Sequence, residues 1–153
     1  MSVICFYFLT KLVCLINTYK TQKMEENKST IGKIVWADLT VENSTELKDF
    51  YKEVIGWDIK NVAMKDGDEH YNDYAMLTSP EEATGGVCTK RGVNKNIPSQ
   101  WIIYISVENV SKSLEKALEL GATSIHEIKN KEGKLQFAII QDPSGAVFGL
   151  SQN

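Results

Sequence analysis

One tripeptide occurs twice in this chain, each time between an apolar stretch and an amphipathic one. Val41-Glu42-Asn43 is followed by a helical pattern that stops at Gly56, and Val107-Glu108-Asn109 is followed by a similar pattern that stops at Gly121. Each copy is typical of a strand, a polar helix start, a helix and a glycine stop. The repeat therefore predicts two similar modules.

The first module is expected to contain one helix and four strands. Its first strand runs from Lys33 to Val41, and Asn43 with Glu46 three residues later predicts a helix N-cap. The helix carries an apolar stripe with the spacing i, i+3, i+4, i+7, made by Leu47, Phe50, Tyr51 and Val54. Three short strands follow, at about residues 58–64, 71–77 and 86–90. These elements make a βαβββ unit.

The second module repeats this order. A strand over 101–107 precedes a helix whose apolar face is Val110, Leu114, Ala117 and Leu118. Strands are expected at 124–128, 135–141 and 146–151. Proline and glycine in Asp142-Pro143-Ser144-Gly145 predict a type I turn before the last strand.

Composition limits the partners of this chain. It has 153 residues, of which 42% are hydrophobic and 24% charged, and its formal net charge is −3. A nucleic-acid-binding protein needs a concentrated basic face, so this class is excluded and a small molecule or another protein is the expected partner. Cys5, Cys14 and Cys88 form neither a disulfide framework nor a metal-ligand spacing, which favours a reducing, cytoplasmic location and a buried, structural Cys88.

The N-terminal segment differs from the rest. Residues 1–23 are largely apolar but lack the features of a good signal peptide or membrane span, and translation starting at Met24 is the favoured explanation. An N-terminal anchor remains the alternative, although membrane association is not expected. We interpret residues 1–30 as an extension outside the fold and 31–153 as a single domain, with modules at about 31–95 and 98–151.

Several short motifs between residues 31 and 151 carry a family resemblance: Ile34 to Leu39, Phe50-Tyr51, Gly56-Trp57, Gly85-Gly86-Val87, Trp101 to Val107, Leu120-Gly121-Ala122, and Asp142 to Ala146 with Phe148. As a set they resemble the vicinal oxygen chelate superfamily, which holds glyoxalase I, extradiol dioxygenases and bleomycin-resistance proteins, and most of all its small glyoxalase-like branch. The resemblance implies an α+β fold in which the sheets of two βαβββ modules curl around a central pocket. It also implies a homodimer.

Metal-dependent members of this superfamily hold a divalent ion with His or Glu at four strand positions. By resemblance these positions fall on Trp36, Ile102, Gly86 or Val87, and Gly149. None of these side chains can ligate a metal, so we expect no metal and no cofactor. The two histidines, His70 and His126, are expected on the surface.

A different set of residues is expected to line the pocket. Trp36 and Asp38 share one face of their strand because strand side chains alternate, and the resemblance turns this face toward the pocket. Ile102 and Tyr104 occupy it in the second module, and Tyr74 and Gln136 are the further candidates. If the protein is an enzyme, Asp38 is the best proton acceptor and Tyr104 the best proton donor.

Three functions remain open. The first is a metal-free protein that binds a small organic molecule in an aromatic pocket. The second is an enzyme, either a lyase or isomerase that uses Asp38 and Tyr104, or a dioxygenase-type metal enzyme whose ligands lie elsewhere. The third is a dimeric interaction module with no open pocket.

Overall fold

The computed structural model describes residues 30–152, which form two helices, a short 3-10 helix and eight strands. The interpretation of the N-terminal segment falls mostly outside these residues. The first module contains β1 (Ile34–Val41), α2 (Ser44–Ile55), β2 (Asp58–Asp66), β3 (Glu69–Ser79) and β4 (Glu82–Thr89). After the 3-10 helix Gly92–Asn94, the second contains β5 (Trp101–Ser106), α3 (Val110–Glu119), β6 (Thr123–Lys129), β7 (Leu135–Gln141) and β8 (Val147–Ser151).

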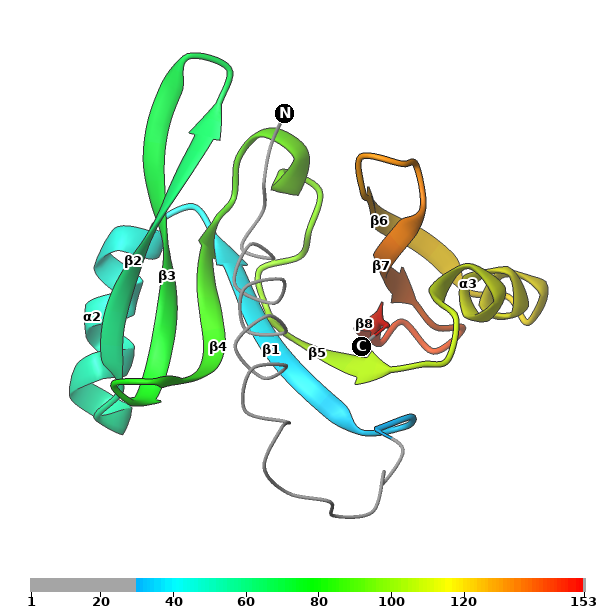
Figure 1. Ribbon diagram of the computed structural model, residues 1–153, viewed down its shortest axis with the longest axis horizontal. Coiled ribbons are helices and arrows are strands. Elements are labelled where there is room, and N and C mark those ends of the chain that lie inside the picture. The colour runs from blue at the N-terminus through cyan, green and yellow to red at the C-terminus, as the bar shows by residue number, and fades with distance from the viewer. Residues whose placement is uncertain (1–29, 153) are drawn as a thin grey trace.

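All eight strands belong to one mixed sheet with the order β2-β3-β4-β1-β5-β8-β7-β6. In each module the first strand pairs in parallel with the last one, β1 with β4 and β5 with β8. The modules meet where β1 and β5 pair antiparallel. The sheet bends at this seam, and α2 and α3 cover its outer side at opposite ends (Figure 1). The prediction of an α+β fold with two βαβββ modules is therefore confirmed.

The two helices pack on the sheet through different side chains. In α3, Val110 and Leu114 are buried against β7 and β8, as the sequence predicts. Leu118, which was expected on the same face, is exposed. In α2 only part of the predicted stripe is covered: Leu47 and Tyr51 contact the sheet, whereas Phe50 and Val54 are exposed. The prediction that all four side chains pack inward is wrong, because the helix touches the sheet along a narrower strip than the spacing suggests.

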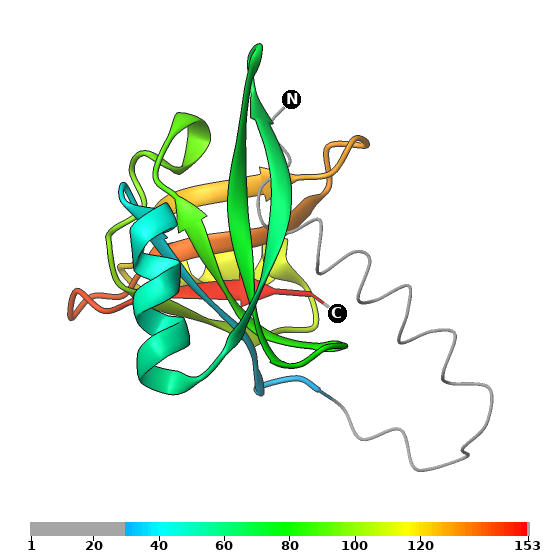
Figure 2. The ribbon, with the colours of Figure 1, turned by 90° about the vertical axis from the view of Figure 1, so that its left-hand side faces the viewer.

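The first module differs from its predicted strand limits. β3 and β4 are longer than expected and are joined by a tight turn at residues 80–81, with an irregular register near Leu77. The hairpin of β2 and β3 extends beyond the rest of the sheet (Figure 2). The turn before β8 is present, since the Gly145 N–H donates to the Asp142 carbonyl at 3.0 Å.

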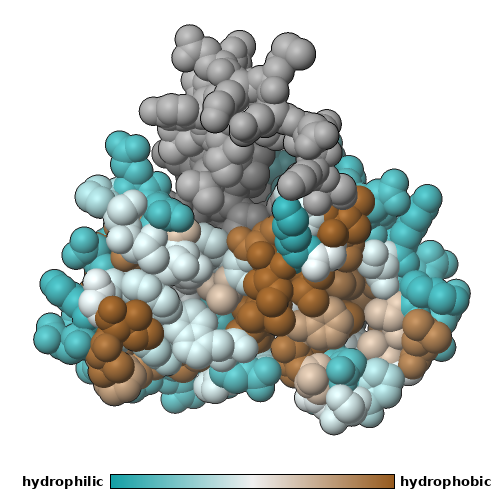
Figure 3. Space-filling model, turned by 90° about the horizontal axis from the view of Figure 1, so that it is seen from below, coloured by the Kyte–Doolittle hydropathy of each residue, from teal (hydrophilic) through white to brown (hydrophobic). Residues whose placement is uncertain are grey.

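The outer side of the seam exposes hydrophobic side chains. Ile34 and Ile103 are 62% and 38% exposed, and Ile31 lies exposed just before β1. Seen from below, hydrophobic surface gathers in the middle of the molecule, between the two modules (Figure 3). Large exposed apolar patches on a protein often mark contacts with other molecules. Within residues 30–152, no helix is both long and apolar enough to cross a membrane.

Candidate functional site

The strands at the seam bring the main predicted residues together. We call the side of the sheet opposite the helices the inner face; Trp36, Ile102 and Tyr104 are buried there in one cluster. The Trp36 indole Nε1–H donates to Asp38 Oδ1 at 2.7 Å, so Asp38 shares this face. In the register of β1 and β5, Trp36 lies opposite Tyr104 and Asp38 opposite Ile102. The predicted grouping of these four residues on one face is confirmed.

Tyr104 packs against two residues of the second module, Gly149 and Phe137. Its ring lies over Gly149, its partner on β8, so closely that a Cβ at position 149 would lie 2.2 Å from the ring. The ring also lies nearly perpendicular to the ring of Phe137, with 5.9 Å between the ring centroids. The absence of a side chain at Gly149 therefore makes room for this phenol ring.

Of the two other candidates, Tyr74 does not join this group. Tyr74 packs with Leu39 and Val41 under α2, and its hydroxyl shares a 3.0 Å hydrogen bond with that of Thr45. The expectation that Tyr74 lies beside Trp36 is wrong: β3 runs in a register that turns Tyr74 toward the helix. Gln136 is half-buried on β7.

The four positions that hold metal in metal-dependent members of the superfamily that the sequence resembles do not fit a metal here. Trp36 presents an indole, Ile102 an alkyl chain, and Gly149 a space filled by the Tyr104 ring. Divalent transition metals need imidazole, carboxylate or thiolate donors. Within the described part of the chain, no three His, Cys, Asp or Glu side chains gather in a way that could hold an ion.

The histidines differ from one another. His70 is exposed, as expected. His126 is not a surface residue: its ring lies 6.3 Å from that of Phe137, and its buried Nε2 has no hydrogen-bond partner among the described residues. Burial lowers the pKa of His126, and nearby Glu127 opposes this effect. The expectation failed because a strand with weak alternation gave no signal for which side chains point inward.

Sequence reasoning did not identify Asp73 as a site residue. Asp73 is fully buried on β3. The next residue, Tyr74, packs under α2, and side chains alternate along a strand, so Asp73 points to the opposite side, the inner face, as Ala75 does. Its Oδ1 accepts a hydrogen bond from the Thr89 backbone N–H at 2.7 Å, whereas Oδ2 has no partner within residues 30–152. Burial raises the pKa of Asp73 to about 6, against the effect of Thr89. A charged residue directly before the apolar run Tyr74 to Leu77 was the available signal.

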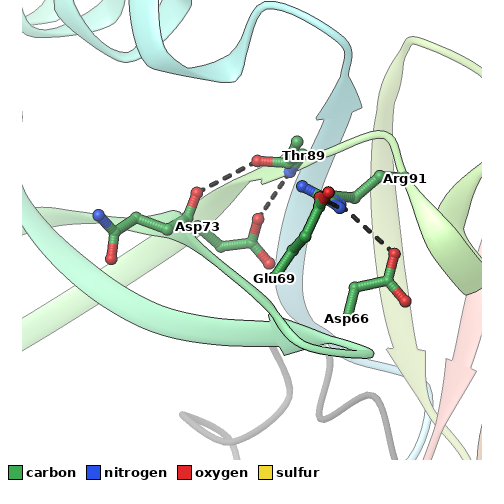
Figure 4. Close-up of polar contacts among 6 residues, drawn as sticks. Asp66, Glu69, Asp73, Thr89 and Arg91 are labelled. Atoms are coloured by element: carbon green, nitrogen blue, oxygen red, sulfur yellow. Dashed lines mark hydrogen bonds and ion pairs between the residues drawn. The ribbon is translucent and has the colours of Figure 1, made fainter.

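Arg91 follows Thr89 by two residues and lies at the same corner of the inner face as Asp73 (Figure 4). Arg91, just after β4, pairs with Glu69 and with Asp66, whose Oδ2 lies 3.4 Å from its Nε (Figure 4). Its guanidinium also stacks over the Tyr71 ring at 4.7 Å. Burial, followed by the negative charge of Asp73, raises the pKa of Tyr71 to about 12. Arg91 thus ties the long hairpin to the chain that leaves β4.

A separate open groove lies on the other side of the sheet. It has a volume of about 660 Å³ and runs between α3 and the hairpin of β6 and β7, with Leu114, Leu118 and Leu135 among its lining side chains. Its charged residues, which include Glu115 and Lys134, are exposed to solvent. We therefore place the candidate site at the seam and not in this groove.

Known proteins resemble this chain in sequence and in fold. Two curated relatives, from Mycobacterium bovis and Mycobacterium tuberculosis and named "Putative glyoxylase CFP32", are 24% identical over 119 residues. The match covers 78% of this chain and 43% of each relative, so the chain spans less than half of their length.

Solved structures share the fold. Hypothetical protein BH1468 from Bacillus halodurans C-125 superposes with a TM-score of 0.53 and 10% identity, over 80% of this chain and 94% of that protein. Methylmalonyl-CoA epimerase from Mycobacterium tuberculosis gives a TM-score of 0.50 and 10% identity, over 84% and 93%. Residues 35–151 match the glyoxalase-like domain family. The chain therefore belongs to this family, within the vicinal oxygen chelate superfamily.

Proposed function

We propose that this protein binds a small organic molecule on the inner face of the seam, without a metal ion. The observation that carries the proposal is the buried Trp36–Asp38 hydrogen bond opposite Tyr104, which brings an indole, a carboxylate and a phenol together on one face of the sheet. Flat apolar walls with a few polar groups are how small-molecule sites are generally built. Gln136 remains a candidate contact from β7, and a cytoplasmic location is part of the proposal.

The test follows the Trp36 indole N–H in ¹H–¹⁵N spectra of the full chain. Addition of 2-phenylethanol, an aromatic alcohol, is expected to shift this signal, and Trp36→Phe, which removes it, is expected to weaken binding of the same probe. Trp57→Phe is the matched control, because Trp57 lies with Tyr51 and Trp101 on the α2 side. Equal weakening by both substitutions, or no shift in the wild type, contradicts the proposal.

Metal independence has its own measurement. Native mass spectrometry after incubation with nickel, iron or manganese salts is expected to show no stoichiometric uptake, because the four superfamily positions offer no donor atoms. One ion per chain would instead favour the metal-enzyme alternative.

A metal-free lyase or isomerase is the second candidate function. It is favoured by the same 2.7 Å hydrogen bond, because an indole N–H that holds Asp38 also orients its carboxylate for proton transfer. Tyr104 lies across the seam as the proton donor of this alternative. Solvent deuterium appearing in a ligand that copurifies with the protein, and lost in Asp38→Asn, would support catalysis over binding alone.

We also propose that the protein forms a homodimer through the hydrophobic outer side of the seam. Ile34 and Ile103 are exposed there, and a specific interface usually buries more than 1,000 Å² with an apolar centre. Ile103→Lys is expected to give a monomer in native mass spectra, while Leu118→Lys, on the exposed face of α3, leaves the dimer intact. A wild-type monomer contradicts this proposal.

A further inference from the structure

We propose that Asp73, with Tyr71 and Cys88 beside it, forms a subsite for the ammonium group of an amine-bearing ligand whose apolar part lies on the aromatic side chains of the seam. The inference rests on the proposed function, because it assigns the chemical class of the molecule bound there. It adds a second polar position, on β3, to the one that Asp38 supplies on β1.

The position of Asp73 places it next to the seam cluster. Tyr74, the residue after Asp73, pairs with Val87 of β4, so in this antiparallel pair Cys88 lies beside Asp73. Cys88 is buried in the same cluster as Trp36 and Tyr104. One side chain, Cys88, therefore connects the aromatic group to the buried carboxylate.

The two oxygens of Asp73 have different surroundings. Thr89 fixes Oδ1 through its backbone N–H, which sets the orientation of the whole carboxylate. Oδ2 is buried and has no hydrogen-bond partner among the described residues. Both oxygens are turned toward the end of β4 that carries Thr89 and Arg91 (Figure 4). A buried acceptor without a donor is costly, and a ligand that donates to Oδ2 removes this cost.

The surrounding charges favour a cation over a neutral donor. Arg91 is a positive group at this corner, but Glu69 and Asp66 already pair with it. After burial, which is the largest cause, Asp73, Asp66 and Cys88 also raise the pKa of Tyr71, whereas Arg91 lowers it. Burial also raises the pKa of Asp73 to about 6, so the carboxylate is largely ionised at pH 7.5. An ammonium group supplies both the missing charge and the missing donor.

A metal ion fits this corner less well than an amine. Asp73 is the buried carboxylate, while Asp66 and Glu69 are engaged by Arg91, and no cluster of three metal-binding side chains exists within residues 30–152. The partly exposed Tyr71 ring and the aromatic cluster beyond Cys88 match the hydrocarbon part of an arylalkylamine.

Two probes that differ in one group test the inference. 2-Phenylethylamine and 2-phenylethanol share a ring and a two-carbon chain, but only the amine carries an ammonium group at pH 7.5. Titrated into the full chain, the amine is expected to bind about tenfold more tightly and to shift the Thr89 amide signal, because Thr89 is bonded to Asp73. Asp73→Asn keeps an oxygen for Thr89 and is expected to abolish the preference. Asp58→Asn, on the exposed start of β2, is the matched control and keeps it.

The outcomes separate the two proposals. Equal binding of amine and alcohol to the wild type, or a preference that survives in Asp73→Asn, overturns the subsite. If the alcohol still shifts the Trp36 indole signal in that case, the proposed function stands. If neither probe shifts either signal, both proposals fail. A Thr89 amide that both probes shift equally in the wild type contradicts the subsite even if Asp73→Asn does not fold.

Discussion

The two modules share one order of elements, and they differ most on their inner faces. In the second module this face is apolar and aromatic, with Phe137 and Ile139 buried at its centre. In the first it carries the buried carboxylate of Asp73 and the stacked pair of Tyr71 and Arg91. On the helix side both modules bury apolar side chains. The comparison shows that packing against a helix limits one face of each sheet, while the other face can take on chemistry.

The helix starts differ as well, although their sequences match. Asn109 caps α3, since its side chain accepts a hydrogen bond from the Lys112 backbone N–H at 2.9 Å. Asn43 occupies the predicted N-cap position before α2, but its side chain makes no such bond within the described residues. Its backbone has φ −99° and ψ 42°, outside the extended conformation from which a cap side chain folds back. Instead, Ser44 shares a 2.8 Å hydrogen bond with Thr89 of β4.

The largest expected effect comes from filling the space under Tyr104 in the second module. Gly149→Val places a side chain where even a Cβ meets the ring at 2.2 Å, and overpacking of this kind costs about 3 kcal/mol of unfolding free energy. Urea denaturation gives this value. In a Tyr104→Ala background, where the ring is gone, the same substitution should cost much less; an unchanged cost would show that the close packing of ring and glycine is not the reason.

A smaller effect is expected at Asp73, in the first module. Its pKa is raised on folding from 3.8 to about 6, so the folded protein binds more protons than the unfolded chain between these pH values, and stability falls as pH rises through this window. Asp73→Asn removes the buried charge and should stabilise the protein by about 2 kcal/mol more at pH 7.5 than at pH 4.

Chemical denaturation at both pH values measures this difference. Asp58→Asn, at an exposed position on β2, is the control and should show no comparable dependence. If Asp73→Asn changes stability equally at pH 4 and pH 7.5, the inner face of the first module does not hold a carboxyl group whose pKa is raised by burial.

The smallest expected effect is the difference in stability between substitutions at the two helix starts. Asn109→Ala removes a cap hydrogen bond and should cost about 1 kcal/mol of unfolding free energy, whereas Asn43→Ala should cost less than about 0.5 kcal/mol. Thermal or urea unfolding of the two variants suffices, because each serves as the other's control. Equal losses would mean that Asn43 caps its helix in solution.

The sequence alone determined the repeated order of strands and helices, the family, and the face shared by Trp36, Asp38, Ile102 and Tyr104. These follow from short-range sequence patterns, namely alternation within a strand, helical spacing of apolar residues, and glycine or proline at the turns. The repeated tripeptide was sufficient to find two modules, because each copy marks the same transition from strand to helix.

Only the tertiary structure decided which side chains meet across strands. Tyr74 turned out to face α2, His126 to be half-buried, and Asp73 to hold a buried oxygen without a partner. Each depends on the register between strands, and a slip of one residue moves a side chain to the opposite face of the sheet. Burial, which raises the pKa of Asp73, likewise arises only when β3 and β4 come together, so no local pattern could reveal it.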